Sequence, residues 1–385
     1  MNQNILKESY TYMPNAGASR LFFIDNLRVS LVILVLLHHV SIVYSAIIPF
    51  YYVEPPTNDP TAFLVFLIFA LVNQAWFMGA LFLLSGYFTS GSFDRKGPRL
   101  YLKDRLLRLG IPLIVFFFVL NPISVPGTII SFTWQEYLRF LGMGPMWFVA
   151  MLLIFNLGYT GLRMLKKNDT SHTMNKSAKI TYLRIGVFIM ALATASYAVR
   201  TVVPIGKDIF GFPTLSYLPQ YLSFFVLGII ASRNNWFKTI PNSTGIAGFI
   251  TAAISGVILL PLAFSGKLFS LALTPALTNL FGKGHWQSAV YALWDSIFAV
   301  GICLSAITFF RRFLNEKGNF SKFLSKHSYT VYIIHIPIIV YIALVLKGFN
   351  PGPLPKFVIV TTISVPTCFA IAYIIRKIPF VSRIL

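Results

Sequence analysis

The sequence predicts an all-α protein that crosses a membrane about ten times, and three observations lead to this prediction. Only 11% of its 385 residues are charged and 56% are hydrophobic, whereas a soluble domain carries about 25% charged residues. Apolar runs of roughly 18 residues or more recur from end to end, and each is long enough to cross a bilayer. The basic residues gather in alternate gaps between these runs.

Ten spans follow from the apolar runs and from the residues that interrupt them. Inside a bilayer each run must satisfy its own backbone hydrogen bonds, and an α-helix does this within one segment. The predicted spans lie near residues 27–48, 61–88, 109–130, 145–165, 183–203, 215–232, 244–264, 286–309, 329–347 and 357–379.

The gaps between the spans divide into two sets by charge. One set holds 25 of the 32 Lys and Arg residues, and the positive-inside rule assigns that set to the cytoplasm. It comprises the chain up to Arg28, the gaps 89–108, 163–184, 233–243 and 311–327, and the end from Arg376. Both termini are therefore predicted to be cytoplasmic, in agreement with an even number of spans.

This charge distribution also bounds the function. The net charge of +21 is typical of nucleic-acid-binding proteins, but here it lies in membrane-flanking gaps rather than on amphipathic faces, so nucleic-acid binding is disfavoured. Cysteines are present only as Cys303 and Cys368, both inside apolar runs, and no zinc or disulfide spacing occurs. We expect a cytoplasmic tail over 1–26, one transmembrane domain over 27–379 and a second tail over 380–385.

Ionisable groups inside a span are costly and therefore candidate functional residues. The first span holds Arg28 and, eleven residues later, His39. Eleven residues are three turns of a helix, so the two side chains share a face about 16 Å apart along the axis. A cation at the cytoplasmic surface in line with a deeper base favours an anionic ligand whose reactive end reaches His39. The alternatives are a snorkelling arginine and a histidine that only packs.

A second ionisable group, Asp295, lies about nine residues into its span and hence near the middle of the membrane. A carboxylate at that depth needs a partner. His39 is the candidate by depth alone, since a carboxylate could orient its ring and stabilise the imidazolium. The alternative is a structural hydrogen bond to another helix.

Two further pairs of residues are separated by three positions. Arg105 and Arg108 share a helical face and could bind a phosphate or pyrophosphate, although any cytoplasmic gap is rich in basic residues. Tyr332 and His335 also share a face, for which a structural polar cluster is the favoured interpretation.

Five segments, taken together and in order, resemble the acyltransferase-3 family of bacterial membrane O-acyltransferases, particularly its branch related to glucan biosynthesis protein C. They include an arginine eleven residues before a histidine, a Ser-Gly-Tyr element, an Arg-x-x-Arg…Pro element and a Trp-Phe pair. The matching residues are Asp25, Arg28, His39, Ser85, Gly86, Tyr87, Arg105, Arg108, Pro112, Trp147, Phe148, Ser328, Tyr329, Tyr332 and His335. Met146 stands where the family usually has leucine, which is a mild change.

The resemblance implies transfer of an acyl group, acetyl or succinyl, from a cytosolic acyl-CoA to a hydroxyl of an extracytoplasmic glycan, in a bacterial inner membrane. It implies that His39 deprotonates the acceptor or takes up the acyl group. Arg28, Arg105 and Arg108 would then bind the donor phosphates. Asp295, by its depth and not by the resemblance, is the expected catalytic partner of His39. The supporting residues would be Asp25, Ser85, Tyr87, Trp147, Tyr332 and His335, and no metal is expected.

Two other functions fit parts of the pattern. A proton-coupled transporter of glycans or lipids could use His39 and Asp295 as a relay, but the Arg-x-x-Arg element and the lack of internal repeats fit it less well. A non-catalytic partner of a polysaccharide synthase could retain the fold. Membrane lipid surrounds the chain in every case, and the sequence leaves open the acyl group, the glycan and whether copies of the chain form a homo-oligomer.

Overall fold

The computed structural model describes residues 21–45, 47–54, 59–130, 133–165, 180–267, 278–316 and 318–385. Within these ranges the chain is helical, and apart from one isolated bridge between Ile209 and Phe212 it contains no β-structure. The all-α prediction is therefore confirmed. Most of the predicted N-terminal tail, 1–26, lies outside the described residues.

Nine helical segments of the described ranges are long and apolar enough to cross a membrane. The helices that form them are α1 (Phe22–Ser45), α2 (Pro60–Arg105), α7 (Trp147–Leu165), α8 (Tyr182–Val202), α9 (Leu218–Arg233), α11 (Asn242–Ala263), α13 (Trp286–Phe313), α14 (Asn319–Val345) and α15 (Pro353–Ile375). A polytopic helix bundle is thus observed. Every predicted span overlaps one of these segments.

One segment accounts for two of the predicted spans. Helix continues over 64 residues, Pro60–Ile123, which at 1.5 Å per residue is about three times the thickness of the hydrocarbon core. Gly97 has φ 71° and ψ 169°, a conformation open to glycine, and Pro98 follows. This break divides the segment into two legs that each reach across a bilayer, so nine segments are compatible with about ten crossings.

The connection between these two legs differs from the loop that we expected over 89–108. It is helical apart from the break at Gly97, because α2 runs on to Arg105. The second leg then alternates between π-helical and α-helical turns. These are a π-helix at Leu106–Gly110, α3 (Ile111–Val115), a second π-helix at Phe116–Leu120 and α4 (Asn121–Ile123).

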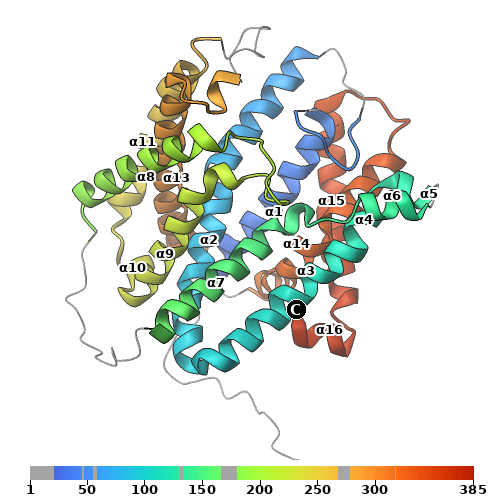
Figure 1. Ribbon diagram of the computed structural model, residues 1–385, viewed down its shortest axis with the longest axis horizontal. Helices are drawn as coiled ribbons and strands as arrows, with labels where there is room; N and C mark the ends of the chain where they lie inside the picture. Colours follow the sequence, from blue (N-terminus) through green and yellow to red (C-terminus); the bar gives the residue numbers. More distant parts are fainter. Residues whose placement is uncertain are drawn as a thin grey trace, which may run out of the picture.

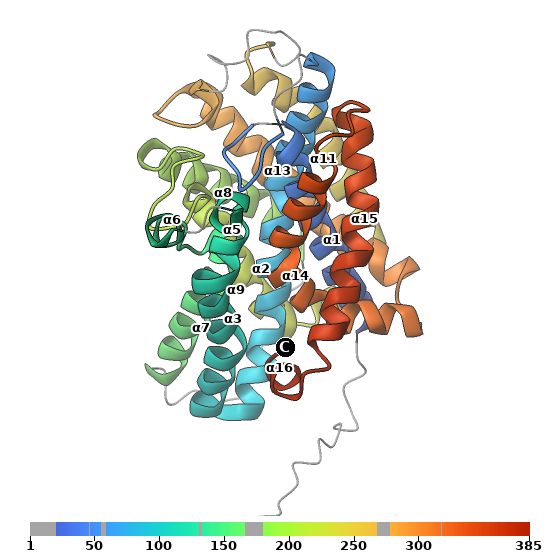
Figure 2. The same ribbon diagram turned by 90° about the vertical axis from the view of Figure 1, so that its right-hand side faces the viewer.

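The bundle has two ends, which are linked by separate sets of hydrogen bonds. At the basic end Asn26 donates to the Leu314 carbonyl (2.7 Å) and Arg311 to the Ile240 carbonyl (2.6 Å). Figure 2 shows α16 (Pro379–Ile384) at this same end as the turn between α2 and α3. At the opposite end the Ile205 N–H donates to the Phe281 carbonyl (2.8 Å). The two sets of connections that the sequence distinguishes by charge thus lie at the two ends of the bundle.

The long helices pack around α1 and α2, which run through the middle of the bundle (Figure 1). Helices α14 and α15 flank α1 on one side, and α8, α11 and α13 form a group on the other. Shorter elements complete the ends: α5 (Pro126–Ile130), α6 (Trp134–Arg139), α10 (Trp236–Thr239) and the 3-10 turns Gly144–Met146 and Leu215–Tyr217. Buried residues of α1, α2, α7, α9 and α14 share one hydrophobic core.

Candidate active site

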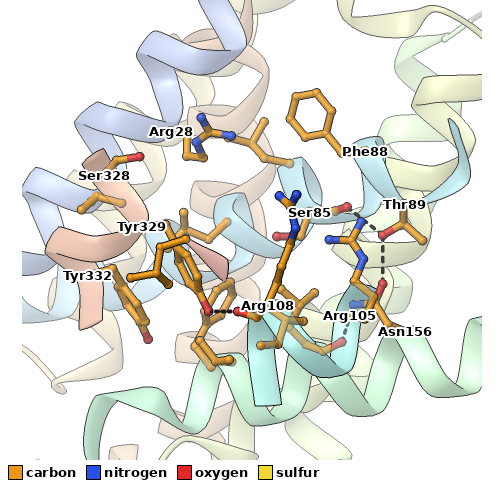
Figure 3. A pocket seen from close by; sticks show the side chains of 18 of the residues that line it. Arg28, Ser85, Phe88, Thr89, Arg105, Arg108, Asn156, Ser328, Tyr329 and Tyr332 are labelled. Atoms are coloured by element: carbon orange, nitrogen blue, oxygen red, sulfur yellow. Dashed lines mark hydrogen bonds between the residues drawn. The ribbon is translucent and has the colours of Figure 1, made fainter. Parts of the chain in front are cut away.

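A cavity of 390 Å³ lies at the basic end of the bundle, between α1, α2, α7 and α14. Figure 3 shows Arg28, Arg105 and Arg108 extending toward this one space. Lys326 also lines it, and none of its described lining residues carries an acidic side chain. The structure therefore brings together the three arginines that the sequence singled out, from segments far apart in the chain.

Local helix geometry positions these arginines. Arg28 lies in the second turn of α1, and Arg105 is the last residue of α2. Arg108 belongs to the π-helix that follows. π-Helical turns are rare in proteins, and those that occur are often found at functional sites.

Part of the hydrogen-bonding capacity of these cations is already used. Asp25 accepts from Arg28 at 3.0 Å, and Asp104 accepts from Arg108 Nε at 3.0 Å. The Nε of Arg105, in contrast, is buried and has no hydrogen-bond partner within the described part of the chain. An ionised donor in that situation has strong affinity for carboxylate or phosphate oxygens.

Positive charge is also crowded just outside the cavity. Burial lowers the pKa of Arg376, and the neighbouring charge of Arg108 lowers that pKa further. Like charges at close range destabilise each other's ionised forms, and a bound anion relieves this repulsion. The basic end is therefore electrostatically suited to a polyanionic ligand.

A polar network supports the wall below Arg105. The Arg105 guanidinium lies 4.9 Å from the centre of the Tyr101 ring. The Tyr101 hydroxyl donates to Asn156. Thr89 donates to the same amide oxygen at 3.3 Å, as Figure 3 shows. Asn156 thus ties α7 to both sides of the break at Gly97. Nothing in the sequence singled out this buried asparagine beyond its place in an apolar span.

The cavity ends at an apolar floor formed by residues such as Val32, Phe148 and Tyr332. The Tyr332 hydroxyl donates to the Pro145 carbonyl, which links α14 to the turn before α7. Neither His39 nor His335 lines the cavity. His335 follows one turn beyond Tyr332, with ring centres 5.8 Å apart.

His39 and His335 form a pair beyond this floor. Their Nδ1 and Nε2 atoms, respectively, lie 3.1 Å apart. The Nδ1 of His39 is also 2.9 Å from the Val35 carbonyl, and the Nδ1 of His335 is 2.6 Å from the Tyr332 carbonyl. His335 is fully buried, whereas His39 is half-buried.

For the neutral form of the two rings, these contacts assign the proton positions. A carbonyl oxygen only accepts hydrogen bonds, so both Nδ1 atoms carry a proton. The His39 Nδ1–H then also faces the lone pair of His335 Nε2. The Nε2 of His39 keeps its own lone pair, and this is the arrangement that a general base requires.

His38, the neighbour of His39, lies differently. Its ring packs against Phe77 with centres 5.1 Å apart and meets His39 edge-on. Among the described residues, it is His39 and not His38 whose ring contacts His335. The two adjacent histidines therefore have different surroundings, His39 beside His335 and His38 beside Phe77.

Asp295 does not contact His39, and the pairing that we expected from depth is corrected. Its carboxylate forms an ion pair with Arg200 of α8, and both side chains are almost fully buried. The Arg200 guanidinium also lies over the rings of Tyr217 and Tyr291, at 4.7 and 5.2 Å. The missed signal was Arg200 itself, an opposite charge inside another predicted span.

Comparison with known proteins gives the family. The acyltransferase-3 model, described as an acyltransferase domain, matches residues 21–373. The chain belongs to this family and is a membrane acyltransferase. Proteins named glucans biosynthesis protein C are similar to it: those of Escherichia coli O157:H7 and Shigella dysenteriae serotype 1 are 22% identical over 86% of this chain and 84% of theirs. The one from Salmonella paratyphi B is 23% identical over 86% and 85%. No solved structure matches the chain.

The remaining motif residues of this acyltransferase have separate places. Ser85 lines the cavity, whereas Tyr87 stacks on Phe237 with ring centres 4.4 Å apart. Trp147 stacks on Tyr221, with ring centres 5.5 Å apart.

The glycine of the Ser-Gly-Tyr element has a packing role. A Cβ on Gly86 would lie 2.0 Å from the Phe225 carbonyl oxygen of α9, which is an impossible contact. Gly86 therefore allows α2 and α9 to approach closely. Within the described ranges of this acyltransferase, no group of three His, Cys, Asp or Glu side chains could hold a metal ion.

Proposed function

We propose that this acyltransferase transfers an acetyl or succinyl group from acyl-CoA, bound at the basic end, to a hydroxyl of a glycan on the other side of the membrane. One observation carries the proposal. A cavity lined by Arg28, Arg105 and Arg108 ends one helical turn short of the His39–His335 pair. An anion-binding site and a base are thus aligned through the bilayer.

The donor half rests on charge and distance. Arginine binds phosphate oxygens through paired, planar N–H groups, and coenzyme A carries its phosphates at the end remote from the thioester. Along α1, Arg28 and His39 are separated by about 16 Å. The thioester arm would pass the floor at Tyr332 to bring its carbonyl carbon to His39, which requires that floor to open.

The chemical step uses the lone pair of His39 Nε2. This atom accepts the proton of the acceptor hydroxyl while the oxygen attacks the thioester carbonyl. The C–S bond then breaks, and the coenzyme A thiolate leaves and takes a proton from the imidazolium, so that an ester and a thiol are formed. His335 is a positioning residue, because it holds the His39 ring in the required tautomer. A covalent acyl-histidine at Nε2 uses the same atom.

The sidedness and the acceptor have independent support. The basic end carries the excess of Lys and Arg, and the positive-inside rule supports a cytoplasmic location for it. A bacterial inner membrane provides acyl-CoA on that side. The relatives' name, glucans biosynthesis protein C, supports a glycan as the acceptor.

A transporter that uses a His39–Asp295 relay is less well supported. Asp295 pairs with Arg200 instead. The relay would need a chain of hydrogen bonds between the two residues, whereas within the described part of the chain His39 contacts Val35 and His335, and Asp295 contacts Arg200 and Ser296.

The test is vectorial transfer by purified protein in sealed vesicles. Labelled acetyl-CoA or succinyl-CoA is added outside, a glucose oligosaccharide is enclosed inside, and the enclosed sugar is analysed by mass spectrometry. We expect coenzyme A binding and labelled ester in the lumen. Binding of coenzyme A without ester formation would indicate a non-catalytic partner. Export of the sugar without coenzyme A binding would indicate a transporter.

A further inference from the structure

The segment 47–54, which follows α1 at the opposite end, holds an aromatic ring over the candidate base. The Phe50 ring stacks on the imidazole of His39, with ring centres 5.6 Å apart and an interplanar angle of 20°. Stacked rings in contact are separated by about 3.5 Å, so the phenyl ring is displaced sideways and extends beyond the imidazole. Part of the Phe50 face is therefore not covered by the imidazole, and the Phe50 side chain is half-buried.

This segment is firmly attached to three helical regions. The Glu54 N–H donates to the Val43 carbonyl at 2.9 Å. The Glu54 carboxylate forms an ion pair with Lys356, whose side chain is only 3% exposed. Nearer to Phe50, the Tyr51 hydroxyl donates to Asn121. These contacts fix the position of Phe50 relative to His39.

Tyr51 strengthens this arrangement. Burial raises the pKa of its hydroxyl, which therefore stays a neutral hydrogen-bond donor at physiological pH. Its ring meets Phe50 edge-on at 5.1 Å. Phe50 is thus bounded by His39 on one side and by Tyr51 on another, and both neighbours are themselves anchored.

We infer that Phe50 binds the acceptor, serving as the surface on which a pyranose ring stacks while one of its hydroxyls meets His39 Nε2. The inference rests on the proposed function and adds a binding residue and a ligand class to it. The C–H face of a sugar ring is apolar and packs on aromatic rings, whereas its edge presents hydroxyls. A ring held flat on the exposed part of Phe50 directs such an edge toward the imidazole.

The experiment compares Phe50→Leu and Phe50→Trp with the wild type, using acetyl-CoA and a glucose pentasaccharide. An aromatic contact contributes about 0.5–1.5 kcal/mol. We therefore expect Phe50→Leu to raise the KM for the pentasaccharide about three- to tenfold. Phe50→Trp should restore it. The dissociation constant of coenzyme A should not change in either variant.

Phe210→Leu is the matched control, since Phe210 is 92% exposed at the same end of the bundle and has no contact with His39. It should leave the KM for the pentasaccharide unchanged. Gel filtration and thermal unfolding show whether each variant folds. If Phe50→Leu does not fold, the KM for the pentasaccharide is compared between Phe50→Trp and the wild type.

Each other outcome is decisive. A fall in kcat at unchanged KM would show that Phe50 only orients His39, and an unchanged KM and kcat would remove it from the site. If the wild type consumes acetyl-CoA without esterifying the sugar, the inference that Phe50 binds a saccharide is overturned. The proposal that acyl-CoA is the donor would still hold. Absence of coenzyme A binding would refute the proposed function itself.

Discussion

Arg28, Arg105 and Arg108 line a cavity at the basic end, whereas Arg200 and Asp295 are sealed between helices nearer the opposite end. Both regions place charged side chains within membrane-spanning helices. At the basic end, side chains of Arg28 and Arg108 are 36% and 52% exposed, and cations outnumber carboxylates. In the sealed pair, one cation faces one carboxylate and neither is accessible.

This difference separates binding from structure. A surplus of accessible positive charge can be neutralised by a ligand, so the cavity favours an anion. A buried pair that is already neutral offers a ligand neither access nor net charge, although removing one partner leaves a charge stranded in a low-dielectric interior. Substitutions at the cavity and the base beyond it should therefore affect donor binding or turnover. Substitutions in the sealed pair should affect the stability of the fold.

The largest effect is expected at His39, the candidate base beyond the cavity. His39→Ala should lower kcat about 10²–10⁴-fold, the range that general base catalysis contributes. Coenzyme A affinity and the unfolding temperature in detergent should change little, because His39 is half-buried and makes no ion pair. His38→Asn is the neighbouring control and should retain turnover. Equal losses in both variants would contradict the assignment of the base.

The sealed pair should respond in the opposite way. Arg200→Met should reduce the free energy of unfolding by about 3–5 kcal/mol, because Asp295 would remain buried without its partner. The double variant Arg200→Met/Asp295→Leu should recover most of that loss. Unfolding is measured by temperature or denaturant in detergent, and kcat is measured on the folded fraction. Normal stability with lost turnover in the single variant would break the comparison and return Asp295 to the active site.

The sequence could predict much of the fold because the bilayer allows few solutions. Long apolar runs must become helices, and alternate basic gaps then specify which ends meet. The alignment of Arg28 with His39 could be predicted for a similar reason, since both lie on one helix whose geometry is known. The helical structure on both sides of Gly97 could not be predicted. A basic stretch is as typical of a loop as of a helix that leaves the membrane.

The contacts between side chains on different helices could not be predicted either. Depth along a span gives one coordinate of a residue, whereas contact requires the other two, which depend on how helices pack. Asp295 and His39 agreed in depth, yet the carboxylate contacts Arg200 of α8. His335 illustrates the reverse case, because the structural cluster favoured for it places its ring against His39.

A smaller effect is expected from the cavity's arginines. Arg105→Gln/Arg108→Gln should raise the KM for acyl-CoA about 10- to 100-fold, since a hydrogen bond to a charged group contributes about 1.5–3 kcal/mol. The KM for the acceptor and the free energy of unfolding should be nearly unchanged. Arg139→Gln, an exposed substitution at the opposite end, is the control. An unaltered KM for the donor would remove the distinction between the cavity and the sealed pair.

The smallest effect is expected from Asn156, which supports the cavity wall without a charge. Its side chain accepts hydrogen bonds from Tyr101 and Thr89, and Tyr101 lies under Arg105. Asn156→Leu should weaken coenzyme A binding about two- to tenfold, because a neutral hydrogen bond contributes about 0.5–1.5 kcal/mol and the arginine loses its support. Thr160→Val, one turn away on α7 and equally buried, should leave that affinity unchanged. Isothermal titration of coenzyme A gives the affinity, and thermal unfolding gives the stability. Lower stability at unchanged affinity would place Asn156 with the sealed ion pair, as a residue that holds helices together and takes no part in binding the donor.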